Sequence, residues 1–108
     1  MYNIQISEQA EKDLRGIYEY IAFELLSPDN AAAQLDRLEN AIAKLDYMPE
    51  KYRRYEKEPW RSRGLRVFAV DNYLVFYIPD TELQTVTIIR VMYGRRNVDK
   101  ELEHYIAM

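Results

Sequence analysis

The chain is predicted to fold as one small α+β domain, in which an antiparallel sheet packs against an antiparallel helical hairpin. Three observations predict this class. The N-terminal half carries two apolar patterns with helical spacing, and the C-terminal half carries three runs rich in β-branched and aromatic residues. A chain of 108 residues holds one core and is too short for two. The expected order is β-α-α-β-β-β-α, with a single domain over residues 1–108.

The first two expected elements are a strand and a helix. Tyr2, Ile4 and Ile6 alternate with polar residues, which is the period of a half-buried strand. Ser7 follows as the expected N-cap of a helix. Apolar residues then recur at three- and four-residue steps along one face of that helix: Ala10, Leu14, Ile17, Ile21 and Leu25.

A second helix is predicted directly after the first. Ser27 is its expected N-cap, Pro28 suits the first helical position, and Asp29 suits the first turn. The apolar face of this helix is Leu35, Leu38, Ile42 and Leu45, and Pro49 ends the pattern. Because the connection between the two helices is short, they are expected to pack as an antiparallel hairpin.

The C-terminal half is predicted to be mostly strands. Residues 49–64 show no period and are interpreted as a loop, followed by strands over Leu65–Val70, Tyr73–Ile78 and Thr85–Met92. Asp71 and Asn72 favour a tight hairpin turn between the first two of these strands, because both residues tolerate positive φ. A short final helix is expected over Val98–Tyr105.

Composition excludes several classes of protein. The chain has no cysteine, so disulfides, thiol nucleophiles and thiolate metal sites are excluded, and no pair of carboxylates is spaced for metal binding or acid–base chemistry. We therefore expect no metal and no cofactor. No apolar run approaches the roughly 20 residues that span a bilayer, and the N-terminus lacks the features of a signal peptide. A cytoplasmic protein with no membrane partner is the expectation.

Charge is unevenly distributed along a chain whose net charge is -3. Residues 49–66, called the basic segment below, carry seven basic and three acidic side chains, whereas residues 1–48 carry four basic and nine acidic ones. Tyr52, Tyr55 and Trp60 are interleaved with the basic side chains, a mixture typical of surfaces that bind single-stranded nucleic acid or a protein partner. Alternatively, Trp60 and one of the tyrosines cover the edge of the core.

The three C-terminal strands and the residues after them resemble a known family. The strand Leu65-Arg-Val-Phe-Ala-Val70, the strand Asn72–Pro79 and the ending Ile89-Arg-Val-Met-Tyr-Gly-Arg-Arg96 follow a strand and a helical hairpin. From Tyr2 to about Leu102, this succession is similar to the RelE/ParE superfamily of bacterial type II toxin–antitoxin toxins. The resemblance implies a growth-inhibiting, plasmid-stabilising toxin that is made beside a protein antitoxin and neutralised by it.

The resemblance also allows two branches to be compared. RelE-like members cleave messenger RNA on the ribosome, and ParE-like members act on DNA gyrase. The RelE-like pattern has an arginine where this chain has Leu74 and a tyrosine where it has Leu102, whereas Arg96 keeps a second expected arginine. Tyr105 is a displaced alternative for the missing tyrosine. The chain is therefore placed nearer to the ParE-like branch.

Candidate site residues follow from these patterns. Weak catalytic candidates are Arg96, Arg66 and Tyr93, with a packing tyrosine as the alternative for Tyr93. Arg95 and Arg96 are candidates for target contact, although they are also explained as solvated arginines paired with Asp99 or Glu101. The full set of candidate target-binding residues is Arg95, Arg96, Trp60, Arg61, Arg63, Tyr52 and Arg54.

Three functions remain open from the sequence. The first is a ParE-like toxin that binds gyrase, with its antitoxin seated between the helical hairpin and the sheet. The second is a ribosome-dependent endoribonuclease that uses Arg96, Arg66 and a tyrosine. The third is a non-toxic homologue that binds the antitoxin as a co-repressor. In each case operator DNA is reached only through the antitoxin.

Overall fold

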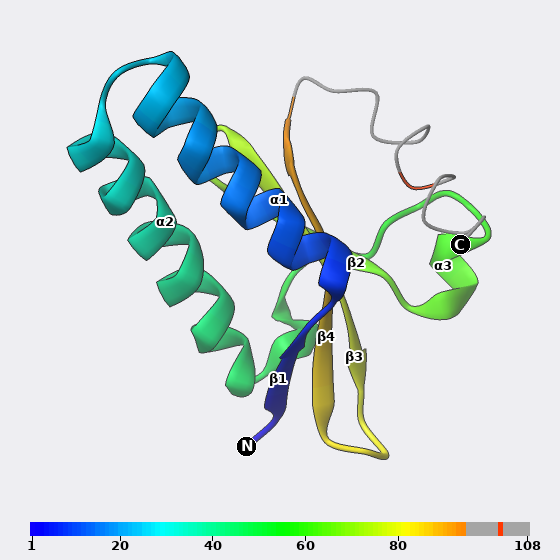
Figure 1. The fold of residues 1–108 in the computed structure, drawn as a ribbon. Helices are drawn as coiled ribbons and strands as arrows, with labels where there is room; N and C mark the ends of the chain where they lie inside the picture. Colours follow the sequence, from blue (N-terminus) through cyan, green and yellow to red (C-terminus); the bar gives the residue numbers. More distant parts are fainter. Residues whose placement is uncertain (95–101, 103–108) are drawn as a thin grey trace.

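The computed structural model describes residues 1–94 and residue 102. Its elements, in chain order, are β1 (Asn3–Ile6), α1 (Glu8–Glu19), the π-helical turn η1 (Tyr20–Glu24), α2 (Pro28–Ala43), the 3₁₀ turns η2 (Lys44–Asp46) and η3 (Pro49–Lys51), the short helix α3 (Trp60–Arg63), β2 (Arg66–Val70), β3 (Tyr73–Asp80) and β4 (Thr85–Tyr93). Figure 1 shows α1 and α2 side by side as an antiparallel hairpin against one face of the sheet, with α3 on the other side. The predicted α+β class and helical hairpin are confirmed.

The sheet is mixed rather than wholly antiparallel. Its four strands lie in the order β1-β4-β3-β2; β2, β3 and β4 are antiparallel neighbours, and β1 pairs with β4 in parallel. The sequence pattern of β1 shows its period and not its direction. Because the helical hairpin carries the chain across one face of the sheet, β1 joins the outer edge of the last strand in the same direction as that strand.

The face of the sheet toward the helices holds the larger apolar core. Tyr77, Val75 and Ile88 from the strands are fully buried there against Leu14 and Leu38 from the two helices. Side chains of the chain itself fill this space, so the expected antitoxin seat between hairpin and sheet is wrong. Tyr77 also donates a hydrogen bond from its hydroxyl to the Pro49 carbonyl, and burial raises the pKa of this phenol to about 12.

A second apolar cluster covers the opposite face of the sheet. It comprises Trp60, Leu65, Val67, Phe76, Ile89, Met92 and Leu102, with Tyr55, Leu74 and Ile78 packed against it. Residues 49–64 contain η3, near the hairpin-side core, and α3, whose Trp60 belongs to the second cluster, so their interpretation as a loop without elements is wrong. The predicted helix over Val98–Tyr105 lies outside the described residues except for Leu102, which is helical and fully buried.

Both helix starts are confirmed, whereas both helices end before their apolar patterns do, α1 at Glu19 and α2 at Ala43. Ser7 caps α1 by accepting a hydrogen bond from the Ala10 amide at 3.0 Å, and α2 begins at Pro28 as predicted. The apolar pattern of α1 was expected to continue through Leu25, but α1 ends at Glu19 and widens into η1. Leu25 therefore lies off the buried face and is 56% exposed. The turn between β2 and β3 has the expected positive φ at Asp71.

Candidate functional site

The basic segment is fastened to the sheet by its own arginines. The Arg66 guanidinium, at the start of β2, donates from Nη1 to the carbonyl oxygens of Glu50 at 2.9 Å and Tyr52 at 2.6 Å. The Arg54 guanidinium donates from Nη2 to the Arg61 carbonyl at 2.9 Å, which joins the strand-like part of the segment to α3. These two cations therefore hold the backbone of the segment in one shape.

The aromatic side chains of the basic segment face inward. Trp60 is only 3% exposed and belongs to the second apolar cluster, with the Arg63 guanidinium 5.4 Å above its ring. Tyr52 is half-buried and stacks on Phe68 with the ring centres 4.3 Å apart. Trp60 therefore covers the edge of the core, as the alternative reading of the sequence expected. The aromatic side chains of this segment do not offer an exposed surface on which bases could stack.

The outer side of the basic segment is charged. The exposed basic residues are Lys51, Arg53, Arg54, Lys57, Arg61 and Arg63. Glu58 accepts hydrogen bonds from the Ser62 hydroxyl at 2.6 Å and the Ser62 amide at 2.8 Å, and these bonds keep the pKa of its carboxyl below the usual range. Of the predicted contact residues, Arg54, Arg61 and Arg63 thus lie together at the surface, Trp60 lies beneath Arg63, and Tyr52 packs against the core on the hairpin side of the sheet.

The two positions that depart from the RelE-like pattern lie on one apolar face. Leu102 is fully buried in the second apolar cluster, and Leu74 packs against the same cluster. Arg66 lies on the opposite face, since it alternates with Val67, whose side chain belongs to that cluster. Where a nuclease of this pattern would gather polar groups, this chain has hydrocarbon.

The remaining weak catalytic candidates do not converge in the described residues. Tyr93 is 39% exposed and meets the Tyr73 ring edge-on at 5.9 Å. The strand register pairs Tyr93 with Tyr73, and Tyr73 with Val70, whereas Arg66 is at the other end of β2, roughly 13 Å away along the strand. Arg95 and Arg96 lie outside the described residues, so their expected role stays a prediction.

A row of tyrosines connects the end of the sheet with the helical hairpin. The pKa of Tyr73 is raised, chiefly by burial and further by the nearby phenols of Tyr93 and Tyr20. Tyr20 comes from η1 and is 56% exposed. This row joins the end of β4 to the outer end of α1, and sequence reasoning did not anticipate it.

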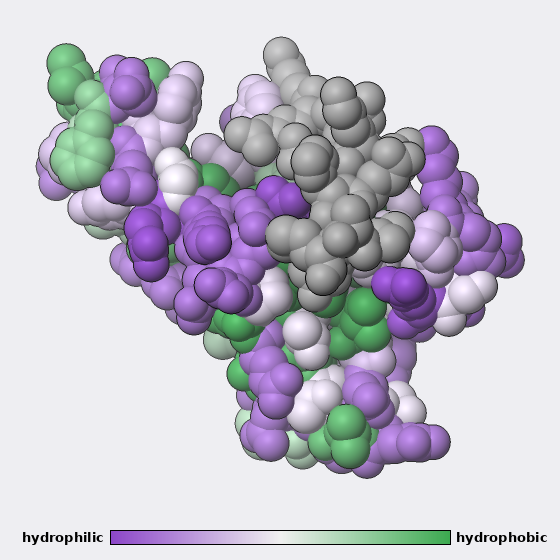
Figure 2. Space-filling view, turned by 45° about the vertical axis from the view of Figure 1, so that its right-hand side comes forward, coloured by the Kyte–Doolittle hydropathy of each residue, from purple (hydrophilic) through white to green (hydrophobic). Residues whose placement is uncertain are grey.

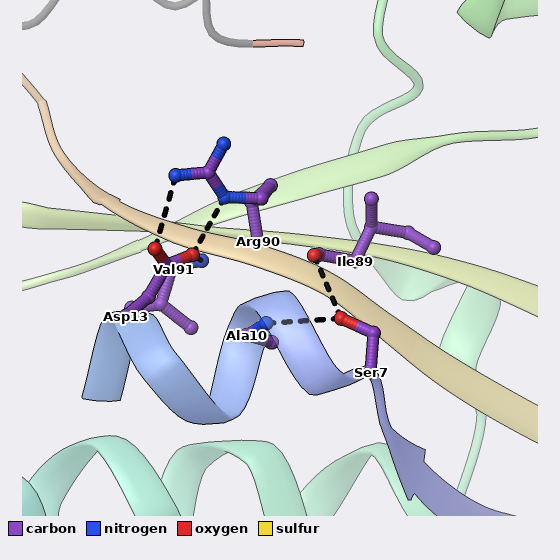
Figure 3. A network of polar contacts seen from close by, with 6 residues as sticks. All are labelled: Ser7, Ala10, Asp13, Ile89, Arg90 and Val91. Carbon is purple, nitrogen blue, oxygen red and sulfur yellow. Dashed lines mark hydrogen bonds and ion pairs between the residues drawn. The ribbon is translucent and has the colours of Figure 1, made fainter. Parts of the chain in front are cut away.

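Sequence reasoning also missed a buried ion pair that orients α1. Arg90 of β4 donates from Nε to Asp13 Oδ2 at 2.7 Å and from Nη2 to Asp13 Oδ1 at 3.0 Å, while the Val91 amide donates to Oδ2 at 3.0 Å (Figure 3). The two side chains are 6% and 10% exposed. A signal was present, because Asp13 shares a helical face with Ala10 and Arg90 interrupts an apolar strand.

The same contacts complete the free edge of β4. The parallel ladder with β1 ends at Ile88, and beyond it Ser7 donates from its hydroxyl to the Ile89 carbonyl at 2.9 Å (Figure 3). The next outward group on that edge, the Val91 amide, is bound by Asp13. Two side chains of the α1 region therefore replace a neighbouring strand, which fixes the end of β4 that leads to Tyr93.

Among residues 1–94 and 102, no three histidine, cysteine or acidic side chains gather as metal ligands would. Within the same described part of the chain, no helix has both the length and the apolar character needed to cross a bilayer.

This arrangement of a mixed four-stranded sheet and two long helices matches the fold of RelE and ParE toxins. The ParDE toxin–antitoxin system of Pseudomonas aeruginosa superposes with a TM-score of 0.71 at 17% identity, over 86% of this chain and 96% of that one. The isolated Escherichia coli RelE toxin gives 0.62 at 16% identity, over 98% and 99%. The RelBE2 toxin–antitoxin complex of Mycobacterium tuberculosis gives 0.60 at 24% identity, over 85% and 90%.

The sequence decides the family within this fold. The family model described as the ParE toxin of the type II toxin–antitoxin system parDE matches residues 4–98. The chain belongs to this family of toxins. A search of curated proteins finds no match to the sequence.

Proposed function

We propose that this toxin inhibits growth by binding a protein target, DNA gyrase, and that it does not cut messenger RNA. The observation that carries the proposal is the apolar character of the Leu74 and Leu102 positions. In-line cleavage of RNA needs a base, an acid and cations around one phosphate. Leu74 and Leu102 supply none of these groups, and both belong to or pack against one hydrocarbon cluster.

The charge of the chain supports the same conclusion. A nuclease that enters an RNA-rich ribosomal site gains affinity from positive charge, and this chain has a net charge of -3. Its positive side chains are concentrated in the basic segment, where Arg53, Arg61 and Arg63 are exposed. We assign this surface, together with Arg95 and Arg96, to contact with the target complex, which includes DNA when the target is gyrase.

The cognate antitoxin is the second partner in the proposal. Three of the similar solved structures are complexes of a toxin with its antitoxin: the RelBE2 complex of Mycobacterium tuberculosis, the RelBE complex of Escherichia coli and the archaeal RelE–RelB complex of Pyrococcus horikoshii. Since the space between hairpin and sheet is filled, the antitoxin segment binds on the outside of this core. Operator DNA is reached through the antitoxin, and the site of action is the cytoplasm.

Induction of the chain in a bacterium tests the proposal. We expect growth arrest, an induced DNA-damage response and intact transcripts, with growth restored when the small neighbouring gene is co-expressed. Codon-registered cuts in transcripts would support the nuclease alternative instead. Normal growth with verified folded protein, together with tight antitoxin binding on operator DNA, would support the co-repressor alternative.

Charge reversal tests the assigned contact surface. The double variant Arg53→Glu/Arg61→Glu should abolish growth arrest, because it reverses two exposed charges of the basic segment. The matched control Lys12→Glu/Lys44→Glu reverses two exposed charges on the helices and should leave the arrest unchanged. If both double variants arrested growth to the same extent, the basic segment would not be part of the target interface.

A further inference from the structure

The outer end of the helical hairpin exposes a group of large apolar side chains. Tyr20, Phe23, Leu25 and Leu26, called the hairpin tip here, are 56%, 66%, 56% and 83% exposed. Figure 2 shows strongly hydrophobic atoms gathered at this end of the molecule, at the upper left, next to hydrophilic surface along the rest of the helices. Exposed leucines are common singly, but four large apolar residues within seven positions form a patch.

The backbone of the hairpin tip turns these side chains outward. A regular α-helix through Leu25 would place this residue on the buried face with Ile21. Instead η1 forms wider hydrogen-bonded turns, with the Leu25 amide donating to the Tyr20 carbonyl at 3.1 Å and the Ser27 amide donating to the Ile21 carbonyl at 3.1 Å. Such π turns are rare and occur frequently at functional sites.

Leu26 adds a second departure from regular backbone. Its φ is 52°, a left-handed value that costs a leucine roughly 1–2 kcal/mol and that glycine or asparagine adopts more easily. Leu26 is also the most exposed residue of the hairpin tip, so no burial within the chain offsets this cost. Because the Leu26 side chain is 83% exposed, it gains little from burial within the monomer, and its benefit is expected in a complex.

The charges around the hairpin tip restrict what binds there. Glu19, Glu24 and Asp29 are exposed around it, and no lysine or arginine occurs between Arg15 and Arg37. An apolar centre with an acidic rim repels nucleic acid and anionic lipid. It also repels a second copy of itself, because the carboxylates of both copies would meet. The complementary surface is a protein groove with an apolar floor and lysine or arginine at its rim.

We propose that the hairpin tip docks this toxin onto its protein target, with Phe23 and Leu26 inserted into an apolar groove that has a basic rim. The inference rests on the proposed function, since it assigns a second contact on the same target complex. The hairpin and α3, which carries Arg61 and Arg63 of the basic segment, lie on opposite sides of the sheet (Figure 1). The target is therefore held at two separate patches of opposite charge.

A pair of matched variants tests this docking site. Phe23→Ser/Leu26→Asn removes two exposed apolar anchors, and asparagine suits the left-handed φ at residue 26. The control Leu83→Ser removes a residue that is 71% exposed in the β3–β4 turn. We expect the tip variant to bind purified DNA gyrase at least ~10-fold more weakly than wild type and to cause less growth arrest. The control should match wild type in both measurements.

Charge reversal of the acidic residues around the hairpin tip gives an independent test. Glu19→Lys/Glu24→Lys should weaken the same binding, whereas Asp36→Lys/Glu39→Lys, which reverses two exposed charges further along α2, should leave it unchanged. The single variant Leu26→Asn should weaken binding while its melting temperature stays equal to or above that of wild type. This result would separate lost docking from lost folding.

Growth arrest by the tip variant equal to that of wild type would overturn the inference while leaving the proposed function intact. Loss of antitoxin binding in the tip variant, loss of a wild-type dimer, or loss of binding to anionic vesicles would assign the tip to another occupant and also overturn it. A wild-type chain that does not arrest growth would refute the proposed function and this inference together. Tip-dependent arrest without gyrase binding would support the docking site and refute gyrase as the target.

Discussion

Asp13 and Arg90 form a buried ion pair that joins α1 to β4. Their side chains are almost fully buried, and Asp13 also binds the Val91 amide. Replacing one partner of such a pair leaves the other charge buried without compensation, which costs more than the pair contributes when it is intact. The pair thus fixes the register between α1 and β4, and with it the place where β4 ends.

Asp13→Asn should lower the free energy of unfolding by roughly 3–5 kcal/mol, because it removes the charge that faces Arg90 and keeps the shape of the side chain. Urea unfolding measures the change. Asp36→Asn, at an exposed position of α2, should change the stability by less than about 0.5 kcal/mol. If Asp13→Asn lowered the free energy of unfolding no more than Asp36→Asn does, the ion pair would have no structural role.

Tyr77 should make the fold sensitive to alkali. Its pKa in the folded state is about 12 because of burial, compared with about 10 in the unfolded chain. The folded state therefore disfavours the phenolate, so stability is retained below pH 10 and falls as the pH rises from about 10 to about 12. Tyr77→Phe should lose about 1 kcal/mol at neutral pH with the bond to the Pro49 carbonyl, and should show a smaller alkaline loss. The denaturant midpoints of wild type and Tyr77→Phe are measured across this pH range. If both midpoints fell equally with rising pH, Tyr77 would not be the source of the alkaline loss of stability.

The element boundaries show what periodicity does and does not determine. Ser7, the apolar face from Ala10 to Ile17, and the strand runs before and after Asp71 predicted α1, β2 and β3 well, because local chemistry decides these elements. The sequence did not predict η1, since Leu25 continues the helical spacing and the wider turn depends on how the hairpin closes. Nor did it predict α3, whose four residues are too few to show a helical period.

The two helix starts offer a matched comparison of capping. Ser7→Ala should lower stability by about 2 kcal/mol, because it removes both the cap on the Ala10 amide and the bond to the Ile89 carbonyl. Ser27→Ala should cost less than about 0.5 kcal/mol, since the Ser27 hydroxyl accepts from the Asn30 side chain and caps no backbone amide. Thermal unfolding of both variants tests this, and equal losses would mean that neither the Ser7 cap nor its bond to Ile89 stabilises the fold.

At the scale of the whole molecule, the class of fold was predictable, and much of the candidate site was not. The direction of β1 is a tertiary property that its alternating pattern does not contain. The inward placement of Trp60 depends on the second apolar cluster, which forms only when β2, β3 and β4 assemble. The departures at Leu74 and Leu102 were visible in the sequence, and the structure adds that both positions serve one hydrocarbon cluster.

Purified gyrase tests the central claim, that this ParE-family toxin acts on a protein target and lacks nuclease chemistry. The measurement is the amount of cleaved plasmid DNA trapped by gyrase after addition of the wild-type chain, with mRNA on programmed ribosomes assayed in parallel. We expect trapped cleaved DNA, its disappearance when the antitoxin is added, and uncut mRNA. Unaffected gyrase together with ribosome-dependent cuts in the mRNA would contradict the account.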